Sequence, residues 1–585
     1  MYLKATKAKN FTYLKLVETV WDKEKKKRRH KVILNLGRLD ILMDKGLVNI
    51  VKSLSNIVNK EISKRPNDQT TQLPVLKGVN NVSEGNILNY GHIVYRNLWN
   101  LFDMGSMLSD LIQNTKIKFD FSDIVYNMVI NQLISPCSKL QLWNHHAKYL
   151  CANQNIDLQH YYRSLDVLAD NKIKIEEYLF QKNCDLSSNQ LDVVFYDVTT
   201  FYFESQKQDD LRDFGFDKDN KINNVHVVLG LLIDKTGKPI GFELFKGNTF
   251  EGKTMISIIT KLKQRFHIDT IIIVADKGLN SKLNLKEIRD ADLHYIISGR
   301  LKSMKSSVQK IVLNPENYTT LNDKEISFLN KDDSDCSFKY KTIDYVNELS
   351  YKENPDDKNF KKIRLKEKLI CTYSLKRATK DKKDRERQLD KAKQIIENNE
   401  KSKLKSHKGH KKYILKNYSK DVDIDNFTMS LDNDKIKNEA KFDGYYVIQS
   451  SKLDLSAKQV IENYHYLYKI EESFRIMKST MQVRPINHWT PKRITGHFVM
   501  CFIAFLLERE LELKLLKHNK INAPEQIKKA INSLTFTKFE IDNEEYFLKN
   551  QNTKLASEIM SVLKVKQPEI LQTKTQAEEY MEQVF

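Results

Sequence analysis

The sequence predicts an α/β fold in which a mixed β-sheet carries helices on its faces. A β-branched and aromatic segment at 191–205 and a hairpin pattern at 223–248, with a turn at 235–238, indicate three consecutive strands. The segment TIIIVADKG at 270–278 is short and almost entirely apolar, as expected of a strand buried on both faces. Two helical patterns and one more strand pattern complete the series: 251–266, 284–291 and 293–301.

The remaining residues form regions of different character. Two strand patterns around the basic stretch 23–29 predict an N-terminal β-hairpin. Apolar residues at helical spacing dominate 76–185. The segment 306–455 is dense in Lys, Asp and Asn with scattered strand patterns, which indicates a β-rich insertion, and helical patterns return after the N-cap candidate Ser456. The expected boundaries are 1–75, 76–185, 190–305, 306–455, 456–516 and, as a helical tail, 517–585.

The composition restricts the partners and the compartment. The 97 Lys and Arg exceed the 76 Asp and Glu, which gives a net charge of +21 and favours a polyanionic partner such as nucleic acid. A solvated, Lys-rich surface is the alternative. The 6 cysteines form no C-x-x-C pair, which argues against a zinc module and suits a reducing cytoplasm. The longest apolar run, 498–507, is too short to span a bilayer, so we expect no membrane partner.

Three acidic residues stand where isolated carboxylates are unexpected. Asp197 lies within a strand pattern and Asp276 ends another, and an ionised carboxylate among apolar residues is costly unless it is paired or bound to a cation. For either aspartate a turn or N-cap role is the alternative. With Glu471 they form a set of carboxylates from three separate segments, which suits two Mg²⁺ ions. Two such ions can activate a water and stabilise the leaving oxygen of a phosphodiester.

Glu471 also belongs to a row of side chains on one predicted helix. Tyr464, Glu471 and Lys478 follow one another at intervals of seven residues. Seven residues is nearly two helical turns, so we expect the three on one face, with neighbours ~10 Å apart along the axis. An i,i+4 pair with Arg475 would account for Glu471 alone, but it does not explain the phenol and the ammonium in the same row.

These motifs resemble those of the DDE transposases of bacterial insertion sequences, in the insertion-sequence-four superfamily. The family pattern Y-x2-R-x3-E-x6-K is matched by Tyr464, Glu471 and Lys478, whereas Leu467 replaces the usual Arg. The similarity covers roughly 190–510. Further segments resemble the subgroup with a long insertion before the Glu: YDVTTFYFES, GNTFEGKT, VADKG, YSLKRA, DGYYVIQSS, KIEESFRIMKS and VRPINHWTPKRITGH.

The resemblance implies a ribonuclease-H-like core, built from 190–305 and 456–516 and interrupted by the insertion. It also implies that Asp197, Asp276 and Glu471 are catalytic and hold two Mg²⁺ ions, for which Mn²⁺ can substitute. The contact that the family's Arg makes is either made here by a neighbour such as Lys469 or Arg475, or lost. The residues expected to contact DNA are Tyr464, Lys478, Arg475, Lys277, Arg484 and Arg493.

The implied reaction is DNA cleavage and strand transfer at terminal inverted repeats, by a cut-and-paste route. The implied partners are double-stranded DNA with these repeats, bound by the hairpin region and by 76–185, and a target DNA. A homodimer in the bacterial cytoplasm, associated with the nucleoid, is expected because an element has two ends. The basic stretches 23–29 and 401–412 are further candidates for contact with the DNA backbone.

Two alternatives remain open. The chain could be another ribonuclease-H-like DNA nuclease, which the Tyr and Lys row and the long insertion disfavour. It could also be an inactive, transposase-derived DNA-binding protein, which the intact set of three acids disfavours.

Overall fold

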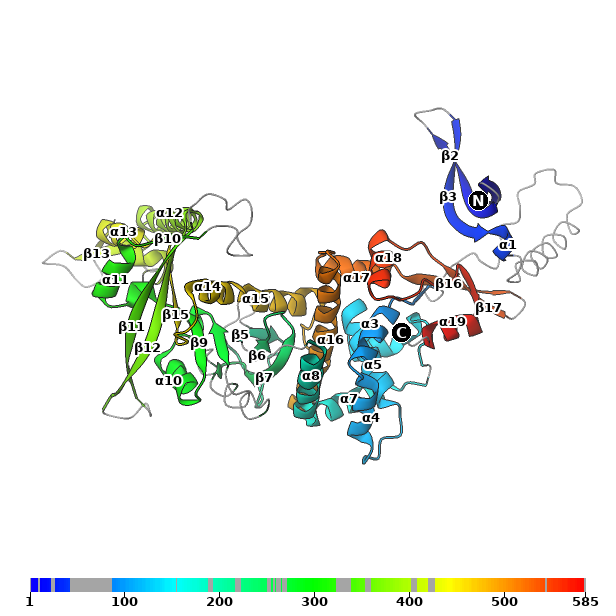
Figure 1. Ribbon diagram of the computed structural model, residues 1–585, viewed down its shortest axis with the longest axis horizontal. Coiled ribbons are helices and arrows are strands. Elements are labelled where there is room, and N and C mark those ends of the chain that lie inside the picture. The colour runs from blue at the N-terminus through cyan, green and yellow to red at the C-terminus, as the bar shows by residue number, and fades with distance from the viewer. Residues whose placement is uncertain are drawn as a thin grey trace, which may run out of the picture.

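The computed structural model (Figure 1) describes most of the chain. The described residues are 2–8, 11–22, 27–42, 87–153, 155–187, 193–215, 223–249, 254–255, 258, 265, 271–321, 338–352, 359–400, 404, 408–418, 427–541 and 544–582. The tip of the predicted N-terminal hairpin, most of the predicted helix 251–266 and about half of the basic stretch 401–412 lie outside them.

The N-terminal region forms a three-stranded antiparallel sheet within the described residues. β2 (Phe11–Asp22) and β3 (Lys27–Arg38) pair as the predicted hairpin, and α1 (Leu39–Leu42) follows. β1 (Tyr2–Ala8) adds a third strand that the sequence did not predict. Its residues are mostly Lys, Ala and Thr, so the apolar alternation that identifies a half-buried strand is weak.

The large sheet is mixed, as predicted. In its described part the strand order is β10-β11-β12-β15-β9-β8-β5-β6-β7. β5, β6 and β7 form an antiparallel meander, and β8 and β9 continue it in parallel with β5. The bounds are β5 (Val193–Tyr202), β6 (His226–Ile233), β7 (Pro239–Lys246), β8 (Ile272–Ala275), β9 (His294–Ser298), β10 (Thr319–Thr320), β11 (Lys339–Tyr351), β12 (Lys361–Tyr373) and β15 (Tyr445–Ser450).

The strands of the 306–455 segment extend this same sheet. β15 pairs with β9, Ile448 opposite Ser298, and β12 then pairs with β15. An unpaired sheet edge presents a row of backbone donors and acceptors that another strand can satisfy, which explains the extension. The other elements of this part of the chain are η5 (Leu301–Ser303), α11 (Ser306–Leu313), α12 (Leu375–Glu397), η8 (Gly409–Tyr413), β13 (Ile414–Tyr418), β14 (Phe427–Leu431) and α13 (Asn433–Ala440).

A long buried helix joins the sheet to the helical region. α16 (Pro491–Lys517) is apolar on all sides between Phe498 and Leu507, and these residues are buried. The ring of Phe498 in this helix packs edge-on against the ring of Phe201 in β5, with the two ring centroids 5.3 Å apart. The other sides of α16 contact α3, α5 and α7 (Figure 1). The helical elements are α3 (Ile93–Leu101), α4 (Met104–Ile112), α5 (Phe121–Ile134), α6 (Lys139–His145), η3 (His146–Lys148), α7 (Leu158–Asp170) and α8 (Lys172–Ser187).

The segment 517–585 is not the purely helical tail that was predicted, because its described part contains strands as well as helices. These strands pair with β4 (Ile87–Asn89) in an antiparallel sheet of order β18-β17-β16-β4. Phe536 of β16 is buried and packs on Tyr90 with ring centroids 4.7 Å apart. The strands are short and have no regular apolar alternation, so no local pattern indicated them. The elements are α17 (Pro524–Asn532), β16 (Thr535–Ile541), β17 (Glu544–Lys549), α18 (Lys554–Val562), β18 (Leu571–Thr573) and α19 (Lys574–Glu582).

No helix in the described part of the chain combines the length and the apolarity needed to cross a lipid bilayer.

The helical region contains a buried histidine that links stability to pH. His92 contacts the Tyr126 hydroxyl through Nδ1 (3.3 Å) and the Leu150 carbonyl through Nε2 (3.1 Å). Burial, aided by the charge of Arg96, lowers its pKa to about 3. The unfolded chain therefore binds a proton at this residue below about pH 6.5, whereas the folded chain does so only near pH 3.

We predict that His92→Gln reduces the pH dependence of the free energy of unfolding between pH 6.5 and 3. In the wild type, His92 lowers the free energy of unfolding by up to ~1.4 kcal/mol for each unit by which the pH is lowered in this window, because folding favours its neutral form. Urea denaturation at several pH values measures the slope. His145→Gln, at an exposed position, should keep the wild-type slope. Equal slopes for wild type and His92→Gln would contradict the assignment.

Candidate active site

Two of the three predicted acids lie at the same level of adjacent parallel strands. Phe195 of β5 pairs with Val274 of β8, so Asp197 and Asp276, each two residues further on, lie level with each other. Asp276 immediately follows β8 and is exposed, whereas Asp197 is partly buried within β5. The carboxyl ends of such strands are where sites gather in α/β sheets.

Both aspartates also belong to the same face of the sheet. Phe195 and Phe201 pack into the core that includes α16, whereas the intervening Tyr196 and Val198 pack into the core on the opposite face. Since side chains alternate along a strand, Asp197 belongs to the α16 face. The same alternation holds in β8, where Ile272 and Val274 face α16 and Ile273 and Ala275 do not. It assigns Asp276 to the α16 face as well.

The segment that carries Glu471 is not one continuous α-helix. α14 (Ala457–His465) begins at the N-cap Ser456, as predicted, and ends before a turn at 466–467. α15 (Tyr468–Arg475) follows, and a π-helical turn, η9 (Ile476–Thr480), comes after it. Tyr464, Glu471 and Lys478 therefore lie on three successive segments. Residues 466 and 467 keep right-handed helical backbone angles, and η9 follows α15 without a gap, so the chain stays helical through the motif while its winding changes twice. The row on one face stays a prediction.

α15 packs on the face of the sheet that bears the two aspartates. Its residues Ile470 and Phe474 are buried in the same core as Phe195 and Phe201, and α15 contacts β5. Glu471 itself is exposed. Among the described residues, no three His, Cys, Asp or Glu side chains are grouped closely enough to hold a metal ion. The structure therefore brings the two aspartates together and places Glu471 on the same side of the sheet, outside a closed three-acid group.

The phenol of Tyr464 points to one of the aspartates. Its hydroxyl donates to Asp276 Oδ1 at 3.4 Å and lies 2.6 Å from the hydroxyl of Tyr446 on β15. Burial raises the pKa of Tyr464, and the neighbouring Tyr446 and Asp276 raise it further. The phenol therefore remains protonated and available as a donor.

Two of the predicted DNA-binding residues lie along the end of β5. The Lys478 ammonium lies 5.7 Å from the ring centroid of Phe201, and the Arg484 guanidinium lies 5.6 Å from that of Tyr202. Phe201 is on the same strand face as Asp197 and four residues beyond it, a separation of ~13 Å along a strand. Lys478 thus lies on the aspartate face beyond Asp197, whereas Arg484 lies beside Tyr202, which strand alternation assigns to the opposite face.

The other predicted DNA contacts are more dispersed. Lys277 follows Asp276 and is exposed. Arg475 is also exposed, and it pairs with Glu472 at 3.5 Å. Arg493 lies at the start of α16, where its Nε bonds Asp166 Oδ1 of α7 at 3.2 Å. Arg493 is therefore engaged with the helical region.

Leu467, at the position where the family pattern has Arg, is buried in the turn between α14 and α15. Lys469 does not replace the missing Arg in this structure, because its ammonium donates to the Lys235 carbonyl in the β6–β7 turn at 2.8 Å. Of the two suggested substitutes, Arg475 is the one exposed toward solvent.

A buried arginine of α16 holds α15 in place. Arg509 donates through Nη2 to Glu472 Oε2 and to Ser473 Oγ, both at 3.2 Å, and through Nη1 to Glu512 at 2.5 Å. Its side chain is only 6% exposed. Glu472 and Ser473 directly follow Glu471, so this contact fixes the part of α15 that carries the third acid.

Sequence reasoning did not identify Tyr446 or Ser298 as part of the site. Tyr446 Oη lies 2.6 Å from Ser298 Oγ at the end of β9, and both residues are next to Tyr464. The available signal was the pair Tyr445–Tyr446 in a strand pattern, since alternation requires the two rings to lie on opposite faces. Nothing in the local sequence shows which face carries the site.

Models of transposase families match two parts of the chain. Residues 188–507, more than half of the chain, match the family model described as the transposase DDE domain. Residues 3–67 match the model described as the N-terminal domain of the IS1634 family of transposases. No curated protein matches the chain. A cryo-EM structure of the piggyBac transposase synaptic complex with hairpin DNA is 10% identical, with a TM-score of 0.33 over 76% of this chain and 80% of that chain.

We predict that Arg509→Leu destabilises the protein by ~3–5 kcal/mol, because it leaves Glu472 and Glu512 without their buried cation. Arg475→Leu is the matched control, since Arg475 pairs with the same Glu472 but is 72% exposed, and exposed pairs contribute ~0–1 kcal/mol. Urea denaturation of both variants gives the comparison. Similar losses for the two would show that Arg509 does not hold α15.

Proposed function

Because the chain belongs to the DDE transposases of bacterial insertion sequences, we propose that it cleaves DNA at the terminal inverted repeats of an insertion sequence and transfers the freed ends to a target by a cut-and-paste route. The observation that carries the proposal is the position of Asp197 and Asp276, level on adjacent strands and on the face against which α15 packs. This is an arrangement of carboxylates suited to phosphoryl transfer.

The topology of the central strands supports a ribonuclease-H-like core. The five strands β7-β6-β5-β8-β9 consist of an antiparallel meander followed by two strands parallel to β5. α14, α15 and α16 come from a distant part of the sequence and cover the face that bears the aspartates. In this proposal the segments 190–305 and 456–516 form one catalytic unit.

The donor chemistry of the site fits a hard divalent cation. Asp197 and Asp276 offer carboxylate oxygens, which Mg²⁺ and Mn²⁺ prefer. We propose that these two residues hold the metal together with Glu471, which has to come within reach of them. When bound, two such ions supply charge stabilisation for the attacking and leaving oxygens of a phosphodiester.

The protein side chains position the DNA for this reaction. In the first step the oxygen of a water bonds to the phosphorus at the end of the element. The bond between this phosphorus and the 3′ oxygen of the element's last nucleotide breaks, which leaves a 3′-hydroxyl on the element. In the second step the oxygen of that hydroxyl loses its proton and bonds to a phosphorus of the target DNA, and the bond from that phosphorus to the target's own 3′ oxygen breaks, which leaves a 3′-hydroxyl on the target strand. Lys478, on the aspartate face beyond Asp197, would bind a phosphate beside the reacting one. Arg484, next to Tyr202 at the end of β5, would bind one further along the DNA strand.

Double-stranded DNA is the partner that the charge supports. The net charge of +21 provides long-range attraction to a polyanion. The proposal includes a homodimer that brings the two ends of the element together, and the N-terminal sheet and helical region as the parts that bind the repeats.

We predict that Asp197→Asn, Asp276→Asn and Glu471→Gln each lower the rate of Mg²⁺-dependent cleavage by more than ~100-fold. A loss of 10- to 100-fold is typical of a group that only supports a metal ligand, so a larger loss indicates direct ligation. The substrate is a duplex with the repeats that flank the gene, and the products are resolved on denaturing gels. Asp290→Asn on α10 (Lys282–Asp290), which packs on the opposite face of the sheet, is the matched control and should cleave normally.

The same assay separates the proposal from its rivals. Cleavage without joining to target DNA would indicate a ribonuclease-H-like nuclease. Specific binding of the repeats without cleavage would indicate a transposase-derived DNA-binding protein. Glu471→Gln cleaving as fast as the wild type would remove Glu471 from the site.

We predict that Lys478→Ala weakens binding to repeat DNA and reduces the slope of log affinity against log salt by ~1, because one phosphate contact is lost. Fluorescence anisotropy between 50 and 200 mM salt, about the range in which phosphate contacts are resolved, measures the slope. Lys286→Ala on α10 removes an equal charge from the opposite face and should leave the slope unchanged. An unchanged slope for Lys478→Ala would show that this ammonium does not contact DNA.

A further inference from the structure

A chain of hydroxyl groups ends on the candidate catalytic carboxylate Asp276. Ser298 Oγ lies 2.6 Å from Tyr446 Oη, which lies 2.6 Å from Tyr464 Oη, and Tyr464 donates to Asp276 Oδ1 at 3.4 Å. The four residues come from β9, β15, α14 and the end of β8. Parts of the chain that are far apart in sequence therefore converge on one carboxylate oxygen.

Proton counting leaves this chain two arrangements. An ionised carboxylate only accepts, and each hydroxyl has one proton to donate. Tyr446 can give its proton to Ser298 Oγ or to Tyr464 Oη. When Tyr464 donates to Asp276, Tyr446 donates to Tyr464 and the Ser298 hydroxyl turns to donate to Tyr446. In that arrangement the hydrogen bonds point the same way and strengthen one another, and Tyr446 fixes the Tyr464 hydroxyl on Asp276.

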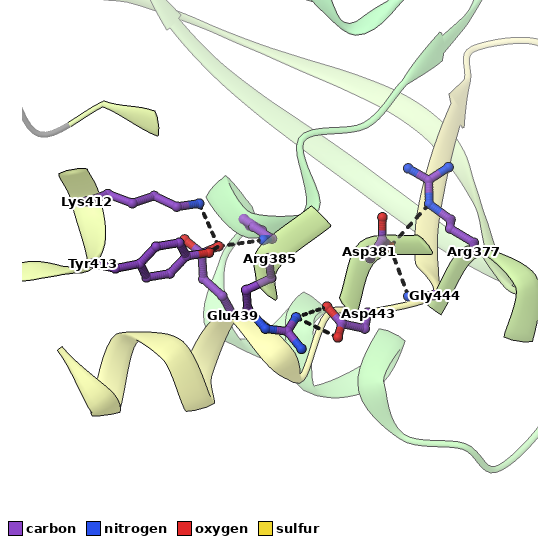
Figure 2. Close-up of polar contacts among 9 residues, drawn as sticks. Arg377, Asp381, Arg385, Lys412, Tyr413, Glu439, Asp443 and Gly444 are labelled. Carbon is purple, nitrogen blue, oxygen red and sulfur yellow. Dashed lines mark hydrogen bonds and ion pairs between the residues drawn. The ribbon is translucent and has the colours of Figure 1, made fainter. Parts of the chain in front are cut away.

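Tyr446 is held from its other side by the start of α12. The Arg377 guanidinium lies 4.2 Å from the centroid of the Tyr446 ring, within the range of a cation–π contact. Figure 2 shows Asp381 between Arg377 and Gly444: its Oδ2 lies 3.6 Å from Arg377 Nε and accepts from the Gly444 backbone N–H at 3.1 Å.

Gly444 allows the start of β15 to lie close against α12. Its φ is +84°, and a Cβ at this position would lie 2.8 Å from Ala378 Cβ. Because only glycine adopts this conformation easily in so little space, the beginning of β15 is fixed against α12 two residues before Tyr446. The ring of Tyr446 is thus anchored by a rigid element of the 306–455 segment, and it is suited to hold another side chain in position.

We propose that Tyr446 is a positioning residue that orients Tyr464 and, through it, the Asp276 carboxylate for metal binding and cleavage. This inference rests on the proposed function of Asp276. It also gives the segment 306–455 a direct physical link to the active site, from α12 through Tyr446. Tyr464 then acts on the carboxylate, in addition to any contact that it makes with DNA.

The test compares Tyr446→Phe with Tyr445→Phe in the full chain. Tyr445 is the matched control, because it is next in sequence, belongs to the core on the other side of the strand, and directs its hydroxyl to the Leu313 carbonyl at 3.5 Å. We expect Tyr446→Phe to reduce the cleavage rate ~10-fold, the lower end of the range for groups that orient a metal ligand. We also expect it to raise the Mg²⁺ concentration for half-maximal cleavage, with DNA affinity unchanged. Tyr445→Phe should match the wild type in each measurement.

A double-mutant cycle tests the route through Tyr464. If Tyr446 acts through Tyr464, Tyr446→Phe causes no further loss in a Tyr464→Phe background. Losses that multiply would overturn the proposal. Ser298→Ala, which removes the hydroxyl that contacts both phenols and keeps the phenols themselves, should cause a smaller loss in the same direction.

A second readout does not depend on cleavage. MnCl₂ or MgCl₂ should raise the Tm of the wild type and of Tyr445→Phe, because a ligand that binds the folded state stabilises it. Tyr446→Phe should show a smaller rise while keeping the Tm of the metal-free protein. If the wild type does not cleave DNA but Tyr446→Phe still shows the smaller metal-induced rise in Tm, the proposed function is rejected and the positioning role is kept. Equal rises for the two Phe variants would reject the positioning role.

Discussion

The parallel pairing of β5 with β8 is the constraint on which the candidate site depends. The register that sets Phe195 opposite Val274 brings Asp197 and Asp276 level and turns both toward α16. Because side chains alternate with a period of two, a slip of one residue in either strand would separate the aspartates onto opposite faces. Such a slip is opposed because it would place a carboxylate in the apolar core on the other face of the sheet.

α16 transmits this constraint to the rest of the molecule. One side of the helix packs on Phe201 of the sheet, and other sides contact α3, α5 and α7. Its last turns carry Arg509, which holds α15 through Glu472 and Ser473. The position of Glu471 therefore depends on a residue 38 positions later in the sequence (509 − 471 = 38), on a helix whose main role is to fill the core.

The sequence allowed the central sheet to be predicted because its strands are marked by local patterns. β5 and β8 are rich in β-branched and other apolar residues, and the acid within β5 and the acid just after β8 stand out against them. The pairing of β15 with β9 could not be read in this way, because it joins residues that are about 150 positions apart and depends on which sheet edge is free. Tyr446 was missed for the same reason: its role follows from the partners that this long-range pairing supplies. β16 and β17 were missed because they are short and carry no regular alternation of apolar residues.

The break at 466–467 and the π-helical turn at Ile476–Thr480 change what the spaced residues mean. In a continuous helix, Tyr464, Glu471 and Lys478 would share one face and move as a unit. Here each group has its own anchor: Tyr464 rests on Tyr446, α15 is held by Arg509, and Lys478 lies on Phe201. π-helical turns occur frequently at functional sites. A motif that is regular in sequence thus spans three short segments with different anchors, and each anchor is a separate position at which a substitution can act on the motif.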